Sequence, residues 1–379
     1  MDDKKNISVK SNAECSGCTL CMNVCPTQAI TMTSDTLGFK YPKVSEDLCI
    51  NCGICLKKCP FSTPIPLNFE QQYFALRHSD ESELLKSQSG AAFVIFSDYI
   101  LSINGIIYGA AFGDGFSVIH KRATNSHERD ELRYSKYIQS DLGFCFKQVL
   151  EDLKLGKAVL FTGTPCQVAG IKEYIPKKWQ ENLYLIDLIC HGVPSPAIWN
   201  DYVQYIEKKY GTIQNAYFRD KRFGWNVQKE TFKCSKERSF ITFKKLFYSN
   251  VCLRESCYEC PFTNYNRVSD LTIGDFWGIE RVPEIANDNR GMSLILVNTE
   301  KALSLLEKAR KGHFCMPIPK DKTSQPQLQY PTKYNENRPK FIEDYGKYGF
   351  KYISKVYSDL NLKTQIRYKL SKIKALLIK

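Results

Sequence analysis

Residues 15–26 read CSGCTLCMNVCP, and residues 49–60 read CINCGICLKKCP. Each run has three cysteines at intervals of three residues, then a fourth cysteine followed by proline. Three such cysteines wrap a tight loop around three corners of one 4Fe-4S cubane, while the fourth cysteine ligates the other cluster. The pattern therefore predicts one cluster on Cys15, Cys18, Cys21 and Cys59, and another on Cys49, Cys52, Cys55 and Cys25.

These two runs are typical of a bacterial-type ferredoxin domain, which exchanges electrons singly. Zinc is the alternative, because C-x2-C pairs also occur in zinc sites. Two complete copies of the longer run favour iron and sulfide. We expect this domain to occupy residues 1–62.

The composition agrees with a metal-binding globular protein. The chain has 379 residues, 43% of them hydrophobic, and 16 cysteines. Its first fourteen residues hold no apolar run, and no stretch reaches transmembrane length. Cysteines in such a chain predict metal ligands in a reducing compartment rather than a disulfide framework. We therefore expect a cytoplasmic protein.

The formal net charge of +13 does not indicate nucleic-acid binding. A cubane on four thiolates carries about −2, which lowers the balance once clusters are bound. From Lys320 onward there are fourteen Lys and Arg against five Asp and Glu. The basic surplus thus belongs to the end of the chain, and we expect no nucleic-acid partner.

Beyond the ferredoxin runs, the pattern changes to alternating strands and helices. We expect a proline-containing linker over 63–86, a larger domain over 87–330 and a basic tail over 331–379. The predicted fold class is α+β. It consists of a two-cluster ferredoxin domain joined to a larger mixed α/β domain with a parallel βαβ core.

The βαβ core is predicted from residues 158–189. A short apolar strand ends in the turn Gly163-Thr164-Pro165-Cys166, a helix follows over 167–175, and a second buried strand ends at Cys190-His191-Gly192. Such strands run parallel in one sheet, and ligands bind at their carboxyl ends. Cys166 and Cys190 therefore come within reach of one metal centre.

A further pair, Cys257-x2-Cys260, has metal-ligand spacing. Together with Cys166 and Cys190 it is expected to hold a third 4Fe-4S cluster. A zinc site that uses Cys252, Cys257 and Cys260 is one alternative, and free buried cysteines are another. The isolated cysteines at 145, 234 and 315 are interpreted as packing residues.

The larger domain resembles the coenzyme F(420) hydrogenase/dehydrogenase beta-subunit family. The matching motifs are SGAAF (89–93), SKYIQSDLG (135–143), FTGTPCQVAG (161–170), LICHGVPSP (188–196), FRDKRFGW (218–225), SCYECPF (256–262) and SDLTIGDFWGIE (269–280). The resemblance implies FAD in the larger domain, beside a 4Fe-4S cluster. One departure is Ala91, where the family has a second glycine, so close approach of the backbone is less free there.

Two turns contain glycine and can offer backbone N–H groups to the FAD pyrophosphate, although neither is a G-x-G-x-x-G fingerprint. The candidate FAD-binding residues are Ser89, Gly90, Tyr137, Gly163, Thr164 and Pro165. His191 and Asp275 are the candidate catalytic residues. His191 is a candidate proton donor, with hydrogen bonding to its own loop as the alternative. Asp275 lines the site or caps the next turn. The charged run Arg219–Arg222 either grips an acidic group or forms a solvated loop.

Residues 360–379 predict a basic amphipathic helix, with Leu362, Ile366 and Leu370 on one face. Such a helix suits peripheral contact with an anionic membrane surface, a partner groove, or the protein's own body.

The sequence thus predicts an iron–sulfur flavoprotein oxidoreductase that passes single electrons through clusters to FAD and a small-molecule or cofactor substrate. An electron-relay subunit without substrate chemistry of its own is the alternative. Either function needs a protein that donates or accepts electrons.

Overall fold

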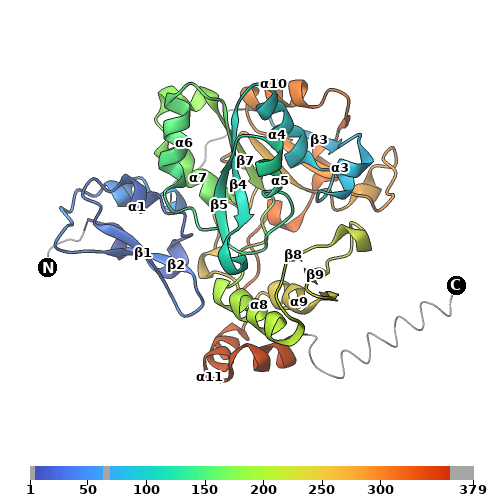
Figure 1. Cartoon of the computed structure of the whole chain (residues 1–379). Helices are drawn as coiled ribbons and strands as arrows, with labels where there is room; N and C mark the ends of the chain where they lie inside the picture. Colours follow the sequence, from blue (N-terminus) through green and yellow to red (C-terminus); the bar gives the residue numbers. More distant parts are fainter. Residues whose placement is uncertain (1–4, 63–68, 359–379) are drawn as a thin grey trace, which may run out of the picture.

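The computed structural model describes residues 5–62 and 69–358. A small N-terminal unit, blue in Figure 1, lies beside a larger body built on an eight-stranded sheet. The predicted terminal helix over 360–379 lies outside the described residues.

The large sheet has the strand order β13-β3-β12-β11-β7-β6-β4-β5. Its strands are β3 (Gln72–Arg77), β4 (Ile106–Phe112), β5 (Val118–Ala123), β6 (Val159–Gly163), β7 (Leu183–Leu188), β11 (Leu271–Asp275), β12 (Ser293–Val297) and β13 (Phe314–Pro317). Strands β4, β6, β7 and β11 form the parallel pairs of the sheet, and the remaining pairs are antiparallel. The parallel βαβ core and the mixed α/β class are therefore confirmed.

Both faces of the central strands are buried. In β6, Leu160 packs with α4 (Ala92–Ser102) and α10 (Glu300–Ala309), while Val159 and Phe161 pack with α6 (Cys145–Lys154) and α7 (Pro165–Tyr174). Side chains alternate across a strand, so continuous apolar runs supply both layers of the core. The βα connections place their loops at the carboxyl edge of these strands.

The N-terminal unit has an antiparallel pair, β1 (Ile30–Ser34) and β2 (Lys40–Val44), and two short helices, α1 (Leu20–Val24) and α2 (Ile54–Lys57). It packs against α7 through α1 and the turn at Pro60–Ser62. Ser195 Oγ, at the start of α8 (Pro196–Tyr210), donates to Leu37 O over 2.6 Å, and Ala197 N donates to the same carbonyl over 3.1 Å.

A second layer lies below the large sheet in Figure 1. Strands β8 (Asn215–Tyr217), β9 (Glu230–Lys233) and β10 (Glu237–Phe240) form a small antiparallel sheet. It packs with α8, α9 (Thr242–Tyr248) and α11 (Arg338–Val356) around buried aromatic side chains.

Two of the predicted segments outside the central domain contain regular structure. The linker predicted over 63–86 contains β3, which lies between β12 and β13, and a helix α3 (Glu81–Leu85). The tail predicted over 331–379 contains α11, whose Phe341 and Ile353 are fully buried against the α8 layer. Both segments bury apolar side chains against elements distant in sequence, which local composition does not reveal.

Candidate functional site

The ferredoxin cysteines gather in two sets in the N-terminal unit. Burial, and to a lesser degree the thiols of Cys18, Cys15 and Cys59, raise the pKa of Cys21. Burial, then the thiols of Cys25 and Cys52, raise the pKa of Cys55. In each set, the fourth cysteine of one run thus lies with cysteines of the other run.

The two loops share one backbone conformation. The second residue after the first cysteine has positive φ in each run, namely Gly17 (68°) and Asn51 (51°). The residue before each short helix, Thr19 (62°) or Gly53 (72°), does so as well. Left-handed residues at matching positions turn the chain sharply enough for three cysteines to face one point.

Four cysteines of the larger body form a third set at the carboxyl edge of the sheet. Cys166 lies in the first turn of α7, Cys190 follows β7, and Cys257 and Cys260 flank a tight turn. Burial, then the thiols of Cys166, Cys257 and Cys190, raise the pKa of Cys260. Burial, and then the thiols of Cys257 and Cys166, likewise raise the pKa of Cys190. The structure thus brings all four predicted cysteines together.

Cys252 does not belong to this set. Its thiol is fully buried and donates to Leu246 O over 3.3 Å, and none of the four thiols contributes to its raised pKa. Among residues 5–62 and 69–358, no three or more His, Cys, Asp or Glu side chains converge tightly enough for a single metal ion. The alternative zinc set of Cys252, Cys257 and Cys260 is therefore not assembled here.

The third set adjoins one of the ferredoxin sets. Burial, and then the thiols of Cys59, Cys166 and Cys15, raise the pKa of Cys18 to about 12. A Cβ at Gly170 of α7 would lie only 3.2 Å from Cys18 Cβ and 3.3 Å from its Sγ. The glycine therefore lets α7 approach the first cysteine run closely.

The third set also borders a cavity of about 520 Å³, which Cys190 helps to line. Ligand and cofactor sites commonly have volumes of about 300–1,000 Å³. The predicted residues Ser89, Tyr137, Gly163, Thr164, His191 and Asp275 all line this cavity, whereas Gly90 and Pro165 are not part of its wall.

The first turn of α4 forms one wall of the cavity. Ala91 precedes this helix with φ 65°, and its side chain gives no capping hydrogen bond. The first backbone N–H groups of a helix have no partner within the helix, so they remain available to an anion. Ala91 occupies the left-handed region, which is unfavourable for alanine and which glycine, the residue of the family at this position, adopts freely.

Gly90 has a structural role in the same loop. Its N–H donates to Ser293 Oγ over 2.9 Å, and its carbonyl accepts from His78 N. A Cβ there would lie 2.1 Å from Leu76 O. Ser89 Oγ in turn donates to Met292 O over 2.6 Å. This loop is therefore pinned to β3 and β12.

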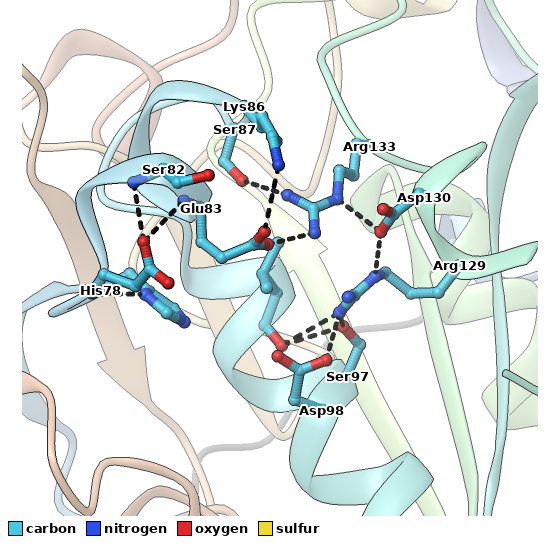
Figure 2. A network of polar contacts seen from close by, with 12 residues as sticks. His78, Ser82, Glu83, Lys86, Ser87, Ser97, Asp98, Arg129, Asp130 and Arg133 are labelled. Carbon is cyan, nitrogen blue, oxygen red and sulfur yellow. Dashed lines mark hydrogen bonds and ion pairs between the residues drawn. The ribbon is translucent and has the colours of Figure 1, made fainter. Parts of the chain in front are cut away.

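A buried network fixes the segment that leads into this loop (Figure 2). Arg133 donates to Ser87 Oγ, Glu83 and Asp130. Arg129 donates to Asp130 and, on α4, to Asp98. Both guanidinium groups are almost fully buried and are paired with carboxylates. The network thereby ties α3, α4 and α5 (Ser126–Asp130) together beside the cavity.

The second predicted turn offers fewer donors. Thr164 and Gln167 form a reciprocal cap on α7, in which Thr164 N donates to Gln167 Oε1 over 3.1 Å. Pro165 has no N–H group. Of the two turns predicted to meet a pyrophosphate, only that of α4 leaves its first helical turn uncapped.

Both ring nitrogens of His191 are hydrogen-bonded. Nε2 lies 2.8 Å from Asn250 Oδ1, and Nδ1 lies 3.0 Å from Gln327 Nε2. Burial lowers the pKa of His191, which favours the neutral ring. The side chain reaches the cavity wall, but Asn250 and Gln327 already engage both of its nitrogens.

Asp275 is part of an ion pair rather than a turn cap. It accepts from Arg219 Nη1 and from Trp225 Nε1 (2.6 Å), and Trp225 stacks on Trp277 with ring centroids 5.0 Å apart. Lys221 donates to Ser89 O over 2.7 Å, and burial lowers its pKa to about 7. Arg219, Asp220 and Lys221 are buried, so these three residues do not form a solvated loop.

Three residues near the site were not among the site residues predicted from the sequence, although Lys136 lies within the matching motif at 135–143. His120 and Lys136 line the cavity, and Arg254 lies between the first ferredoxin set and the third set. Burial lowers the pKa of His120 to about 4 and that of Lys136 to about 7. Their positions depend on packing between distant segments, which no local spacing encodes.

Comparisons with known proteins identify two domains in the chain. Residues 14–63 match the 4Fe-4S dicluster domain, and residues 156–321 match the family described as the C terminus of the coenzyme F420 hydrogenase/dehydrogenase beta subunit. A similar solved structure is a chain of the F420-reducing [NiFe] hydrogenase complex from Methanosarcina barkeri, in a xenon derivative. It is 16% identical, with a TM-score of 0.47, and the likeness covers 67% of this chain and 84% of that chain. No curated protein matches.

The chain is therefore an iron–sulfur protein of the oxidoreductase class that transfers electrons through two 4Fe-4S clusters. Its larger body carries the C-terminal domain of the coenzyme F420 hydrogenase/dehydrogenase beta-subunit family, which confirms the resemblance. Within the part of the chain that the structure describes, no helix is long and apolar enough to cross a membrane.

Proposed function

We propose that the protein is an iron–sulfur flavoprotein that passes single electrons through three 4Fe-4S clusters to FAD and on to a small-molecule or cofactor substrate. One observation carries this proposal. The set Cys166, Cys190, Cys257 and Cys260 adjoins both the ferredoxin cysteine Cys18 and a cavity that Cys190 lines.

The third set suits a cubane better than zinc. A structural zinc ion binds thiolates at about 2.3 Å, which draws its ligands into one tight group. The four thiols interact with one another without forming such a group. A cubane binds each cysteine at a different iron atom and so accepts wider spacing.

The cavity suits FAD. Its volume is about 520 Å³, and the uncapped first turn of α4 offers backbone N–H groups for the pyrophosphate. Tyr137, His191 and Trp277 supply aromatic wall surface. A bound flavin supplies chemistry that the clusters lack, because it exchanges single electrons on one side and electron pairs on the other.

The other ferredoxin set is the proposed contact site for a partner protein. Cys52, in the other ferredoxin set, is exposed on the surface. We propose that a separate electron-donor or electron-acceptor protein meets the chain there, and that the substrate enters the cavity. If the chain is instead a relay subunit, the purified protein will not turn over any substrate with an artificial electron donor.

Metal and flavin content test the proposal. An anaerobic preparation should contain about twelve irons, as expected for three clusters, and bound FAD. Cys166→Ala and Cys260→Ala should each remove about four irons, keep the ferredoxin signals and abolish reduction of the flavin through them. Cys252→Ala is the matched control and should keep all twelve. A preparation with about eight irons and one zinc would contradict the proposal, as would flavin reduction at the wild-type rate in both cysteine variants.

A further inference from the structure

Arg254 is a cation buried at the junction between the N-terminal unit and the larger body. Only 1% of the residue is exposed. Its Nε donates to Cys15 O over 2.8 Å, Nη1 to Gln139 Oε1 over 3.0 Å, and Nη2 to Lys40 O over 2.9 Å. The guanidinium also lies 4.2 Å from the centre of the Tyr41 ring. The side chain thus joins three segments that are far apart in the sequence.

This guanidinium differs from the other buried arginines in its counter-charge. Arg129, Arg133, Arg219 and Arg267 each form an ion pair with a carboxylate. Within residues 5–62 and 69–358, no carboxylate lies within ion-pair distance of Arg254, whose hydrogen-bond acceptors are neutral oxygens and one sulfur. A buried charge without a partner is strongly unfavourable, so an anion is expected beside it.

Cysteine sulfur atoms of two different sets lie near the Arg254 guanidinium, where the anion is expected. Nη2 lies 3.8 Å from Cys15 Sγ, in the first ferredoxin set. Arg254 also interacts electrostatically with the thiols of Cys166 and Cys257, both in the third set, and its carbonyl accepts from Cys257 N over 3.0 Å. The same cation therefore faces sulfur atoms of two neighbouring sets.

We infer that Arg254 is the shared counter-charge of the cluster on Cys15 and the cluster on Cys166 and Cys257. The inference rests on the third cluster of the proposed function. Reduction potentials of such clusters depend on net charge and on hydrogen bonds to the sulfurs. A fixed cation favours the state with one more electron, so Arg254 raises both potentials and holds the two carriers together.

The other ferredoxin cluster provides an internal reference for the effect of Arg254 on reduction potentials. The set with Cys49, Cys52 and Cys55 receives no hydrogen bond from Arg254 within the described part of the chain. Arg338 supplies a one-sided control, because it interacts with Cys257 and donates to Leu253 O over 3.0 Å. Its loss should affect the third cluster alone.

Redox titration of the full-length holoprotein, followed by electron paramagnetic resonance, tests the inference. In Arg254→Gln and Arg254→Met, the equilibrium constant for one-electron reduction should fall at least tenfold at both neighbouring clusters. For one electron this is a shift of about 59 mV to lower potential. The potential of the cluster on Cys49, Cys52 and Cys55 should not change. In Arg254→Lys, the potentials of both neighbouring clusters should stay close to their wild-type values. Arg338→Gln should lower only the potential of the third cluster.

Each other outcome is decisive. Unchanged potentials in the uncharged variants, or equal shifts at all three clusters, overturn the inference and leave the proposed function intact. A wild-type protein with about eight irons overturns both. If the uncharged variants lose iron from the two neighbouring clusters, recovery in Arg254→Lys supports the counter-charge role. Loss of the same iron in the lysine variant refutes it.

Discussion

The ferredoxin cysteines and the third cysteine set both bring four thiols together, but different features of the fold position them. The first eight cysteines lie in two short runs, and each run supplies three members of one set from a single tight loop. The four cysteines of the third set come from the start of α7, the end of β7 and the turn after Leu253. Local backbone conformation therefore builds the first two sites, whereas the topology of the large sheet builds the third.

The largest expected effect tests how strictly the two ferredoxin runs are interlocked. In Cys25→Ser, the cluster on Cys49, Cys52 and Cys55 should be lost or damaged, because the thiol of Cys25 lies with that set. The cluster on the nearer run should survive. Iron analysis and electron paramagnetic resonance would distinguish the two. Damage confined to the cluster on Cys15, Cys18 and Cys21 would refute the exchange of ligands.

Two substitutions in the loop before α4 test the larger body, whose site depends on the topology of the large sheet. In Gly90→Ala the added Cβ would lie 2.1 Å from Leu76 O, and backbone cannot move aside cheaply, so we expect the unfolding free energy to fall by about 3 kcal/mol. Ala91→Gly should instead gain up to about 1 kcal/mol, because φ 65° strains alanine but not glycine.

Urea denaturation under anaerobic conditions measures both changes. The visible spectrum of the ferredoxin clusters should persist at urea concentrations that already unfold the larger body of Gly90→Ala. If the two substitutions have equal effects, the loop is not pinned to β3 and β12 as its contacts indicate.

The sequence predicted those features that depend on local pattern. Cysteine spacing predicted the iron–sulfur unit, and the alternation of apolar strands and helices predicted parallel β6 and β7 with Cys166 and Cys190 at one edge. Each of these features is determined within a few dozen residues.

Features that depend on distant packing were not predictable. Strand β3 follows a proline-rich segment and has no helix or hairpin partner nearby, yet it pairs with β12 and β13 more than 200 residues away. Arg219 and Lys221 stand in a charged run that is typical of a surface loop, but Asp275 and the carbonyl of Ser89 draw them inside. No neighbouring residue in the sequence marks Arg254 as a buried cation.

A pH experiment separates the cavity region from the ferredoxin unit. Burial lowers the pKa of His120 to about 4, while an unfolded chain has a value of about 6.5. Between these values the unfolded chain binds more protons than the folded protein. The contribution of His120 is therefore fully present above about pH 6.5 and is lost as the pH falls toward 4, by at most about 1.4 kcal/mol per pH unit.

His120→Gln should flatten this dependence, because glutamine can still hydrogen-bond to Thr162 O and Ser140 but does not titrate. Unfolding free energies at pH 7.5 and pH 5.5 give the comparison. An unchanged slope in the variant would assign the pH dependence to another group.

The smallest effect concerns the rim of the junction between the two regions. Lys58 lies in the ferredoxin unit, and its ammonium donates to Glu173 O over 3.0 Å at an exposed position. Water competes for both groups there, and ordering a long side chain costs entropy, so Lys58→Ala should lose no more than about 1 kcal/mol. Because Arg254 joins the same two regions from a buried position, cluster content and potentials should not change in the Lys58 variant. Denaturation at low and high salt should give nearly equal losses, since the acceptor is a neutral carbonyl. A Lys58→Ala protein that released iron from the Cys18 or Cys166 set would show that surface contacts, rather than the buried guanidinium, hold the two regions in register.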